Sequence, residues 1–274
     1  MRVVPALCAL CLVARMAAAD AKLPVFLDAY KADPDAAAIA RALYDNYGDI
    51  ATVGAEEEMD GGYRGKIHLV PELPIKQHRK QLEWVAGALK DFDAFFAAFD
   101  TKPNYRWTKL TLQFVRSVKK RTPSAYATGW SVTHNVNGSL LTSARGVRET
   151  YFHELFHLND FDHGDWSGKN LAKDYAAIVK KCGTKVKCLA PYAPNDTKVR
   201  ATGTYYAFQP NNGNGVHEYA AELAVRYFKE QNEMATAKKL SKPAFKCGPA
   251  ENARAWQGLV DEFFAGRDLV PACN

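Results

Sequence analysis

Two histidines and a glutamate stand close together in the segment Tyr-Phe-His-Glu-Leu-Phe-His-Leu, residues 151–158. On an α-helix, His153 and His157 lie one turn apart on the same face, so both imidazoles can reach a single Zn²⁺ ion. Glu154 can then approach a water held by that ion. The spacing predicts a catalytic zinc site with one ion per chain. The competing interpretation is a charged helix face with two solvated histidines.

Zinc in such a site needs a third protein ligand, and one candidate is local. His163 lies six residues after His157, which is the spacing of the third histidine in metzincins. Asp160 occupies the position of the glycine in that motif, where the backbone must turn sharply in a conformation that glycine adopts most easily.

The other candidate is remote, in the segment His-Glu-Tyr-Ala-Ala-Glu-Leu, residues 217–223. Glu218 and Glu222 share one face of a predicted helix. One carboxylate can complete the zinc site while the other holds a ligand histidine through its free ring N–H. Alanines nearby favour close packing against another helix over a solvated edge, and His217 is expected to point away from the zinc. The residues alone leave Glu218 and His163 as alternatives.

These motifs resemble those of a known family. The His153-Glu154-x-x-His157 segment followed by Asp160, and the Glu-Tyr-Ala-Ala-Glu segment of residues 218–222 with Tyr206-Ala207 upstream, resemble the gluzincin metallopeptidases, and among them the lethal-factor-like group. The resemblance covers about residues 105–230. It implies a zincin-like fold and hydrolysis of peptide bonds.

Carried over position by position, the resemblance implies the following roles. The zinc ligands are His153, His157 and Glu218. Glu154 is the general base, Glu222 supports a ligand histidine, and Tyr206 donates a hydrogen bond to the oxyanion. The link of residues 209–215 between the tyrosine and Glu218 is longer than the family usually has, so Tyr205 is an equal rival by chemistry.

The first residues form a different kind of sequence. A basic Arg2, an apolar run over residues 3–14 and small residues at 17, 19 and 21 make the three-part pattern of a secretory signal. We therefore predict that residues 1–21 are removed and that the protein is secreted or periplasmic. No later stretch approaches the roughly 20 apolar residues that a bilayer span needs.

Four cysteines remain after residue 21, and an even number in an exported chain implies disulfides. Sequence proximity favours the pairs Cys182–Cys188 and Cys247–Cys273. A metal site built from these four cysteines is the weaker interpretation, because the segment Cys-Gly-Thr-Lys-Val-Lys-Cys, residues 182–188, lacks the short Cys-x-x-Cys spacing.

The composition is that of an ordinary globular protein, with 274 residues of which 47% are hydrophobic and 24% charged. It excludes a disordered tail, a coiled coil and a multi-span membrane protein. The net charge of +6 is spread along the chain without the basic and aromatic stripe of a nucleic-acid binder, so no nucleic-acid partner is expected. We predict a monomer.

Hydrophobic periodicity predicts the elements that must position the motifs. Helices are expected near residues 34–47, 75–99, 145–159, 170–181, 216–231 and 250–265. Strands are expected at 66–70 and 110–114, and a hairpin at 126–142 should turn at Asn137-Gly138. The order predicts an α+β fold: an N-terminal lobe (about 22–160) with a small, mostly antiparallel sheet and helices, the active-site helix, and a helical C-terminal lobe (about 161–274).

Three functions are consistent with these patterns. The favoured one is a secreted zinc metalloendopeptidase acting on peptides or proteins, with the predicted hairpin as an edge on which an extended substrate can dock. The alternatives are a zinc amidase acting on a cell-wall or other non-protein amide, and a non-enzymatic exported binding module in which the zinc motif is coincidental.

Overall fold

The chain has two parts that differ in secondary structure and meet at residue 144. The structure is a computed structural model that describes residues 26–61, 64–199, 203–210 and 213–273, so the predicted signal sequence lies outside the described residues. Before residue 144, two helices, α2 (Pro34–Tyr47) and α3 (Arg79–Ala97), accompany all the described strands; after it, the chain is mainly helical. The predicted α+β class is confirmed at this level.

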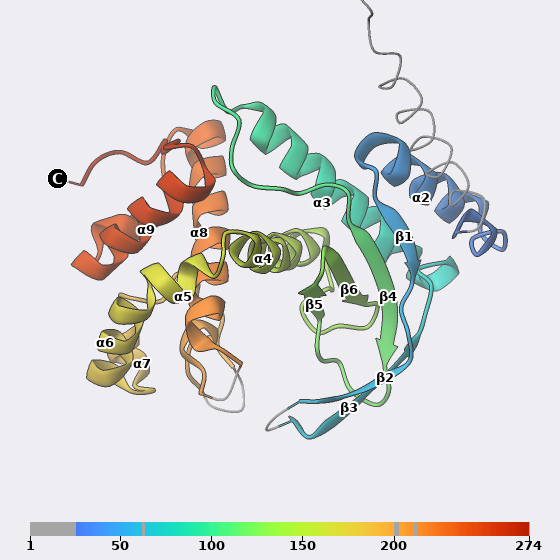
Figure 1. Ribbon diagram of the computed structural model, residues 1–274, viewed down its shortest axis with the longest axis horizontal. Coiled ribbons are helices and arrows are strands. Elements are labelled where there is room, and N and C mark those ends of the chain that lie inside the picture. Colours follow the sequence, from blue (N-terminus) through green and yellow to red (C-terminus); the bar gives the residue numbers. More distant parts are fainter. Residues whose placement is uncertain (1–25, 62–63, 200–202, 211–212, 274) are drawn as a thin grey trace, which may run out of the picture.

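The sheet has six strands: β1 (Ile50–Val53), β2 (Glu57–Asp60), β3 (Lys66–Pro71), β4 (Thr111–Ser117), β5 (Ala125–Thr128) and β6 (Ser131–Asn135). Their order is β2-β3-β4-β6-β5, and β1 also pairs with β4. The sheet curls, as Figure 1 shows. It is mixed, because β4 is parallel to both β1 and β6. Three of the five pairings among the described strands are antiparallel, in line with the expected mostly antiparallel sheet, but the two parallel pairings of β4 were not predicted. The long connection through α3 returns the chain parallel to β1, and two reversals through β5 make β6 parallel to β4.

The hairpin lies elsewhere than predicted. The structure turns at Gly129 and Trp130, which both have a positive φ, so that β5 and β6 pair within residues 125–135. Two-residue hairpin turns favour such backbone conformations. Asn137 instead donates through its side chain to the carbonyl of Ser117, at 3.3 Å, and residues 139–142 form no strand. The Asn-Gly dipeptide therefore ends a strand rather than connecting two.

The helices after the sheet are α4 (Ala144–Asp162), α5 (Trp166–Asn170), α6 (Ala172–Cys182), α7 (Val186–Leu189), α8 (Gly215–Ala237) and α9 (Ala250–Phe263). Short 3-10 turns lie at Lys76–His78 (η2), Tyr206–Phe208 (η3) and Phe245–Cys247 (η4). Among the described residues, no helix has both the length and the apolar character that crossing a membrane requires.

Helix α4 lies between the sheet and the C-terminal helices (Figure 1). Its side chains are apolar on several faces, so the helix is buried on both sides. Phe152 stacks on Tyr105, in the loop between α3 and β4, and on Phe228 of α8, with ring centroids 5.3 and 4.6 Å apart. The Ser143 side chain caps the helix by accepting from Gly146 N. Because α4 is fixed by packing around Phe152, the adjacent His153 has a defined position.

Both predicted disulfides are present, Cys182–Cys188 and Cys247–Cys273, with sequence separations of 6 and 26 residues. The first closes the turn between α6 and α7, and the second ties η4 to the C-terminal tail. Disulfides of this kind are typical of an oxidising, extracellular compartment.

We expect the two bridges to contribute unequally to stability. From loop size alone, Cys182→Ser should lower the free energy of unfolding by about 2 kcal/mol and Cys247→Ser by about 3.5 kcal/mol, because the longer loop restricts the unfolded chain more. Urea unfolding of the two variants and the wild type measures both losses. Equal stability of all three proteins would contradict this expectation.

A buried carboxylate, Asp49, connects α2 to the sheet. Its Oδ1 accepts a hydrogen bond from Leu110 N at 2.8 Å, while Oδ2 has no partner among the described residues. Burial raises the pKa of Asp49 to about 7, although the backbone hydrogen bonds act in the opposite direction. Between about pH 4 and about pH 7 the folded chain therefore holds a proton that the unfolded chain has lost.

This makes stability depend on pH in a defined direction. The free energy of unfolding should fall as the pH rises through that window, by at most about 1.4 kcal/mol per pH unit for this one group. Asp49→Asn keeps an acceptor oxygen and cannot titrate, so its slope should be shallower. Urea unfolding of both proteins at about pH 5 and about pH 7 measures the two slopes, and identical slopes would rule out the role of Asp49.

Candidate metal centre

Three side chains, two from α4 and one from α8, come together in the structure. His153 and His157 project from one face of α4, and their Nε2 atoms are 3.1 Å apart. Glu218, in the first turn of α8, brings its Oε2 to 3.2 Å from Nε2 of His153 and 3.9 Å from Nε2 of His157. The structure thus brings the helical histidine pair to the remote glutamate.

The spacing of these atoms fits one ion. Zinc–ligand distances of about 2.0–2.1 Å with tetrahedral angles place two ligand atoms about 3.3 Å apart. The separations of 3.1 and 3.2 Å lie close to this value, and the third, 3.9 Å, is longer. Two imidazoles with one carboxylate form a ligand set that zinc accepts. The side chain of His153 is 9% exposed, and those of His157 and Glu218 are 23% and 19% exposed. The cluster is therefore sheltered but open on one side.

A second glutamate backs the cluster. Glu222 lies one turn after Glu218 on α8, and its Oε1 is 3.3 Å from Nδ1 of His153. A carboxylate on the far ring nitrogen leaves Nε2 of His153 free for a metal and fixes the orientation of the ring. This contact is the one that the sequence pattern anticipated for Glu222.

The charges of the cluster depend on one another. Burial alone would lower the pKa of His153, but hydrogen bonds with Glu218 and Glu222 outweigh it and raise that pKa well above its usual value. Burial and the neighbouring charge of His153 lower the pKa of His157 to about 4. The histidines and Tyr206 outweigh burial at Glu218 and lower its pKa to about 2. A metal ion therefore competes with a proton on His153, and its binding should release that proton.

Glu154 lies next to the first histidine and is 8% exposed. Burial, assisted by the charge of Glu218, raises the pKa of Glu154 to about 7, although the charge of His153 opposes this. A carboxyl group with such a pKa can both accept and return a proton near neutral pH.

Of the two candidate tyrosines, Tyr206 faces the cluster. Its ring centroid lies 5.9 Å from that of His153, and its hydroxyl hydrogen-bonds to Glu218. Tyr205 is buried at 7% exposure, and its ring lies under the ammonium of Lys198, at 5.2 Å.

His163, the local alternative, lies against α9 instead. Its Nδ1 is 2.6 Å from a carboxylate oxygen of Glu262, and its ring packs on Phe263 with centroids 4.5 Å apart. In the described part of the chain, two groups of side chains could hold a metal ion, His153 with His157 and Glu218, and Asp160 with Asp165 and His217. His163 belongs to neither group. The helix before it ends at Asp162 without the sharp glycine turn of the metzincin motif.

The contact between His217 and Asp165, which links the first turn of α8 to the start of α5, was not predicted from the sequence. His217 points away from the cluster, as expected, and its Nε2 lies 2.7 Å from Oδ1 of Asp165. Asp165 also caps α5 by accepting from Gly168 N. Buried Asp160 accepts from the backbone N and the hydroxyl of Ser167, at 2.7 and 2.5 Å. Together these hydrogen bonds fix the end of α4 relative to the first turn of α8, which carries Glu218.

Comparison with models of known protein families, with curated proteins and with solved structures found no match to this chain. The functional interpretation therefore depends on the residues and on their geometry.

Proposed function

We propose that the chain is an exported, zincin-type zinc metalloendopeptidase of the gluzincin kind. The observation that carries the proposal is the convergence of His153, His157 and Glu218, whose ligand atoms lie 3.1–3.9 Å apart. Glu154 interacts electrostatically with His153 and Glu218. Zn²⁺ held by these three residues would polarise a carbonyl and lower the pKa of a ligated water to about 7. Glu222 keeps His153 oriented toward the ion.

The protein's own groups would carry the proton transfers. Glu154 accepts a proton from the attacking water and returns it to the leaving amine as the peptide bond breaks. Tyr206, within hydrogen-bonding distance of one ligand, donates to the oxygen that becomes negative in the transition state.

The edge of the sheet offers a place for an extended substrate. Among the described residues, β5 pairs only with β6, and it lies against α4. A peptide can add to such an edge through main-chain hydrogen bonds, which would hold its scissile bond over α4. This edge strand comes from the corrected hairpin, residues 125–135.

The experiment that tests the proposal combines zinc content with substrate profiling. Mature, zinc-loaded protein is incubated with a mixed peptide library and, separately, with cell-wall fragments. Cleavage of internal peptide bonds supports an endopeptidase. Release of non-peptide amides alone would support the amidase, and a chain that binds no zinc after reconstitution would leave only the non-enzymatic binding module.

Substitution of the neighbouring Tyr205 and Tyr206 tests which of the two donates a hydrogen bond to the oxyanion. We expect Tyr206→Phe to lower kcat for peptide hydrolysis by about 100-fold, the usual effect of removing one such donor, with zinc content unchanged. Tyr205→Phe, which alters a buried ring away from the cluster, should leave kcat unchanged. A larger loss in Tyr205→Phe than in Tyr206→Phe would reverse the assignment.

A further inference from the structure

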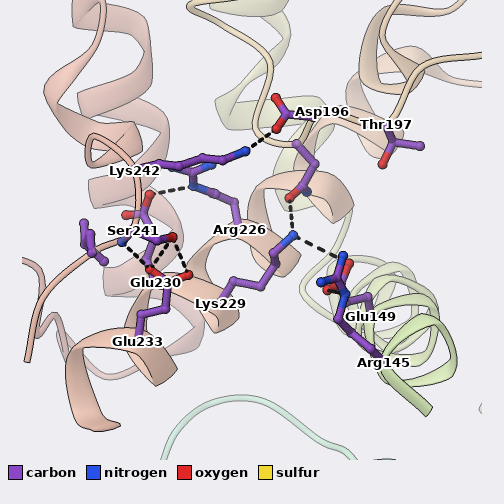
Figure 2. Close-up of a pocket in the computed structure, with 12 residues that line it drawn as sticks. Arg145, Glu149, Asp196, Thr197, Arg226, Lys229, Glu230, Glu233, Ser241 and Lys242 are labelled. Carbon is purple, nitrogen blue, oxygen red and sulfur yellow. Dashed lines mark hydrogen bonds and ion pairs between the residues drawn. The ribbon is translucent and has the colours of Figure 1, made fainter. Parts of the chain in front are cut away.

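A polar pocket lies in the cleft between α4 and α8 (Figure 2). Its volume is about 450 Å³, and its walls come from the start of α4, the loop of residues 195–197, the second half of α8 and residues 240–242. A space of this size accommodates a side chain or a short peptide end.

The pocket lies along the same two helices as the candidate metal centre. Glu149 lies one turn before His153 on α4, and Lys229 lies two turns after Glu222 on α8, which is about 6 Å and about 10 Å along the helix axes. The carbonyl of Thr197, at the wall, accepts a hydrogen bond from Tyr206 N at 2.8 Å. An extended peptide advances about 3.3–3.6 Å per residue. A substrate residue one to three positions from the scissile bond can therefore reach the pocket.

Two of the four carboxylates in the pocket are neutralised by cations of the protein: Arg226 pairs with Glu230, and Lys242 pairs with Asp196. Glu233 accepts hydrogen bonds from the backbone N and the hydroxyl of the neutral Ser241. Counted together, the lining residues carry four cations and four carboxylates.

The remaining carboxylate, Glu149, is shared by two cations. Arg145 Nε lies 3.2 Å from Glu149 Oε1, and Lys229 Nζ lies 3.5 Å from Glu149 Oε2. Lys229 also donates to Asn195 Oδ1, at 3.3 Å, and its charge acts on the carboxylates of Asp196 and Glu233. The terminal amino groups of Arg145 have no hydrogen-bond partner in the described part of the chain. Arg145 and Lys229 therefore share one carboxylate and keep donors for a further acceptor.

We infer that the pocket recognises a carboxylate of the substrate, with Lys229 as its main donor and Arg145 at its mouth. Lys229 is 36% exposed, so a charge-assisted hydrogen bond there is partly sheltered from water. The inference rests on the proposed peptidase function for the source of that carboxylate. It belongs either to an acidic side chain near the scissile bond or to the C-terminus of a short substrate.

The test compares matched peptides. One cleavable sequence carries Glu, Gln or Lys at each position near the scissile bond, with either a free or an amidated C-terminus. We expect kcat/KM to be about 10- to 100-fold higher for Glu than for Gln at one position, the effect of one hydrogen bond to a charged group. A gain that follows the free C-terminus instead identifies the chain end as the source of the carboxylate.

Variants assign the effect to the pocket. Lys229→Gln should bring the Glu-to-Gln ratio close to 1, and Arg145→Gln should reduce it by a smaller factor. Lys90→Gln, which changes an exposed lysine of α3, is the matched control and should keep the wild-type ratio. Zinc content and the unfolding midpoint show whether each variant folds. An unchanged ratio in folded Lys229→Gln, or a preference for Lys, would overturn the inference.

A binding measurement separates this inference from the proposed function. Zinc-loaded protein is titrated with acetyl-glutamate amide, acetyl-glutamine and acetyl-glutamine amide, which carry a side-chain carboxylate, a terminal carboxylate and neither. Binding of a carboxylate compound that is lost in Lys229→Gln supports the pocket even if no peptide is cleaved, in which case only the peptidase proposal fails. Equal binding of all three compounds overturns the inference even if peptides are cleaved.

Discussion

Glu154→Gln should keep zinc and lose hydrolysis, with kcat for peptide cleavage lower by about 100- to 10,000-fold. Glutamine has nearly the same shape as glutamate but cannot accept the proton of the attacking water or return it to the leaving amine. The three ligand atoms belong to other side chains, so zinc content should stay at the wild-type level. Steady-state kinetics on one cleavable peptide, with metal analysis of the same samples, measures both quantities.

A second glutamate-to-glutamine change controls for effects on folding. Glu83, on α3, is 46% exposed and pairs only with Arg79 among the described residues. Glu83→Gln should therefore keep both zinc and activity. Hydrolysis at the wild-type rate by zinc-loaded Glu154→Gln would show that this glutamate is not the base.

The helices could be predicted from the sequence because their signals are local. The N-cap Asp33 and the C-cap Gly48 define α2, and apolar periodicity places α3, α4 and α9 within about four residues of their observed ends. Helix α8 extends to Ala237, past the expected end at residue 231, and the short helices α5 and α7 were not predicted. The sheet could not be predicted in the same way. β4 pairs with β1, β3 and β6, and these partners are chosen by packing between distant segments rather than by any local pattern.

The same distinction applies to the metal centre. The one-turn spacing of His153 and His157, and that of Glu218 and Glu222, follows from helix geometry alone. Which of these side chains meet depends on how α8 packs against α4. His163 shows the limit: its partner is Glu262, 99 residues further along the chain, and nothing in the sequence around His163 signals that contact. The charged pocket beside Glu149 also could not be predicted from the sequence, because it forms only where α4 and α8 pack together.

The identity of the third ligand leads to the other large expected effect. Glu218→Ala removes an oxygen that lies 3.2 Å from Nε2 of His153, and Ala offers no replacement. Losing a partner outside the ligand set commonly costs about 10- to 100-fold in metal affinity, so loss of a ligand should cost more than about 100-fold. Zinc per chain after dialysis against a competing chelator should fall from about one to near zero.

His163→Ala is the decisive comparison, because it removes the competing candidate. It breaks the contact with Glu262 on α9 and should lower the unfolding midpoint, while zinc per chain stays at the wild-type value. Glu222→Gln should fall between the two, since it weakens the support of His153 without removing a ligand. Zinc lost in His163→Ala and retained in Glu218→Ala would require the metzincin-like site. That arrangement needs His163 to leave α9 and turn toward His157, so it would also change the packing of Phe263, which lies against His163 in the structure.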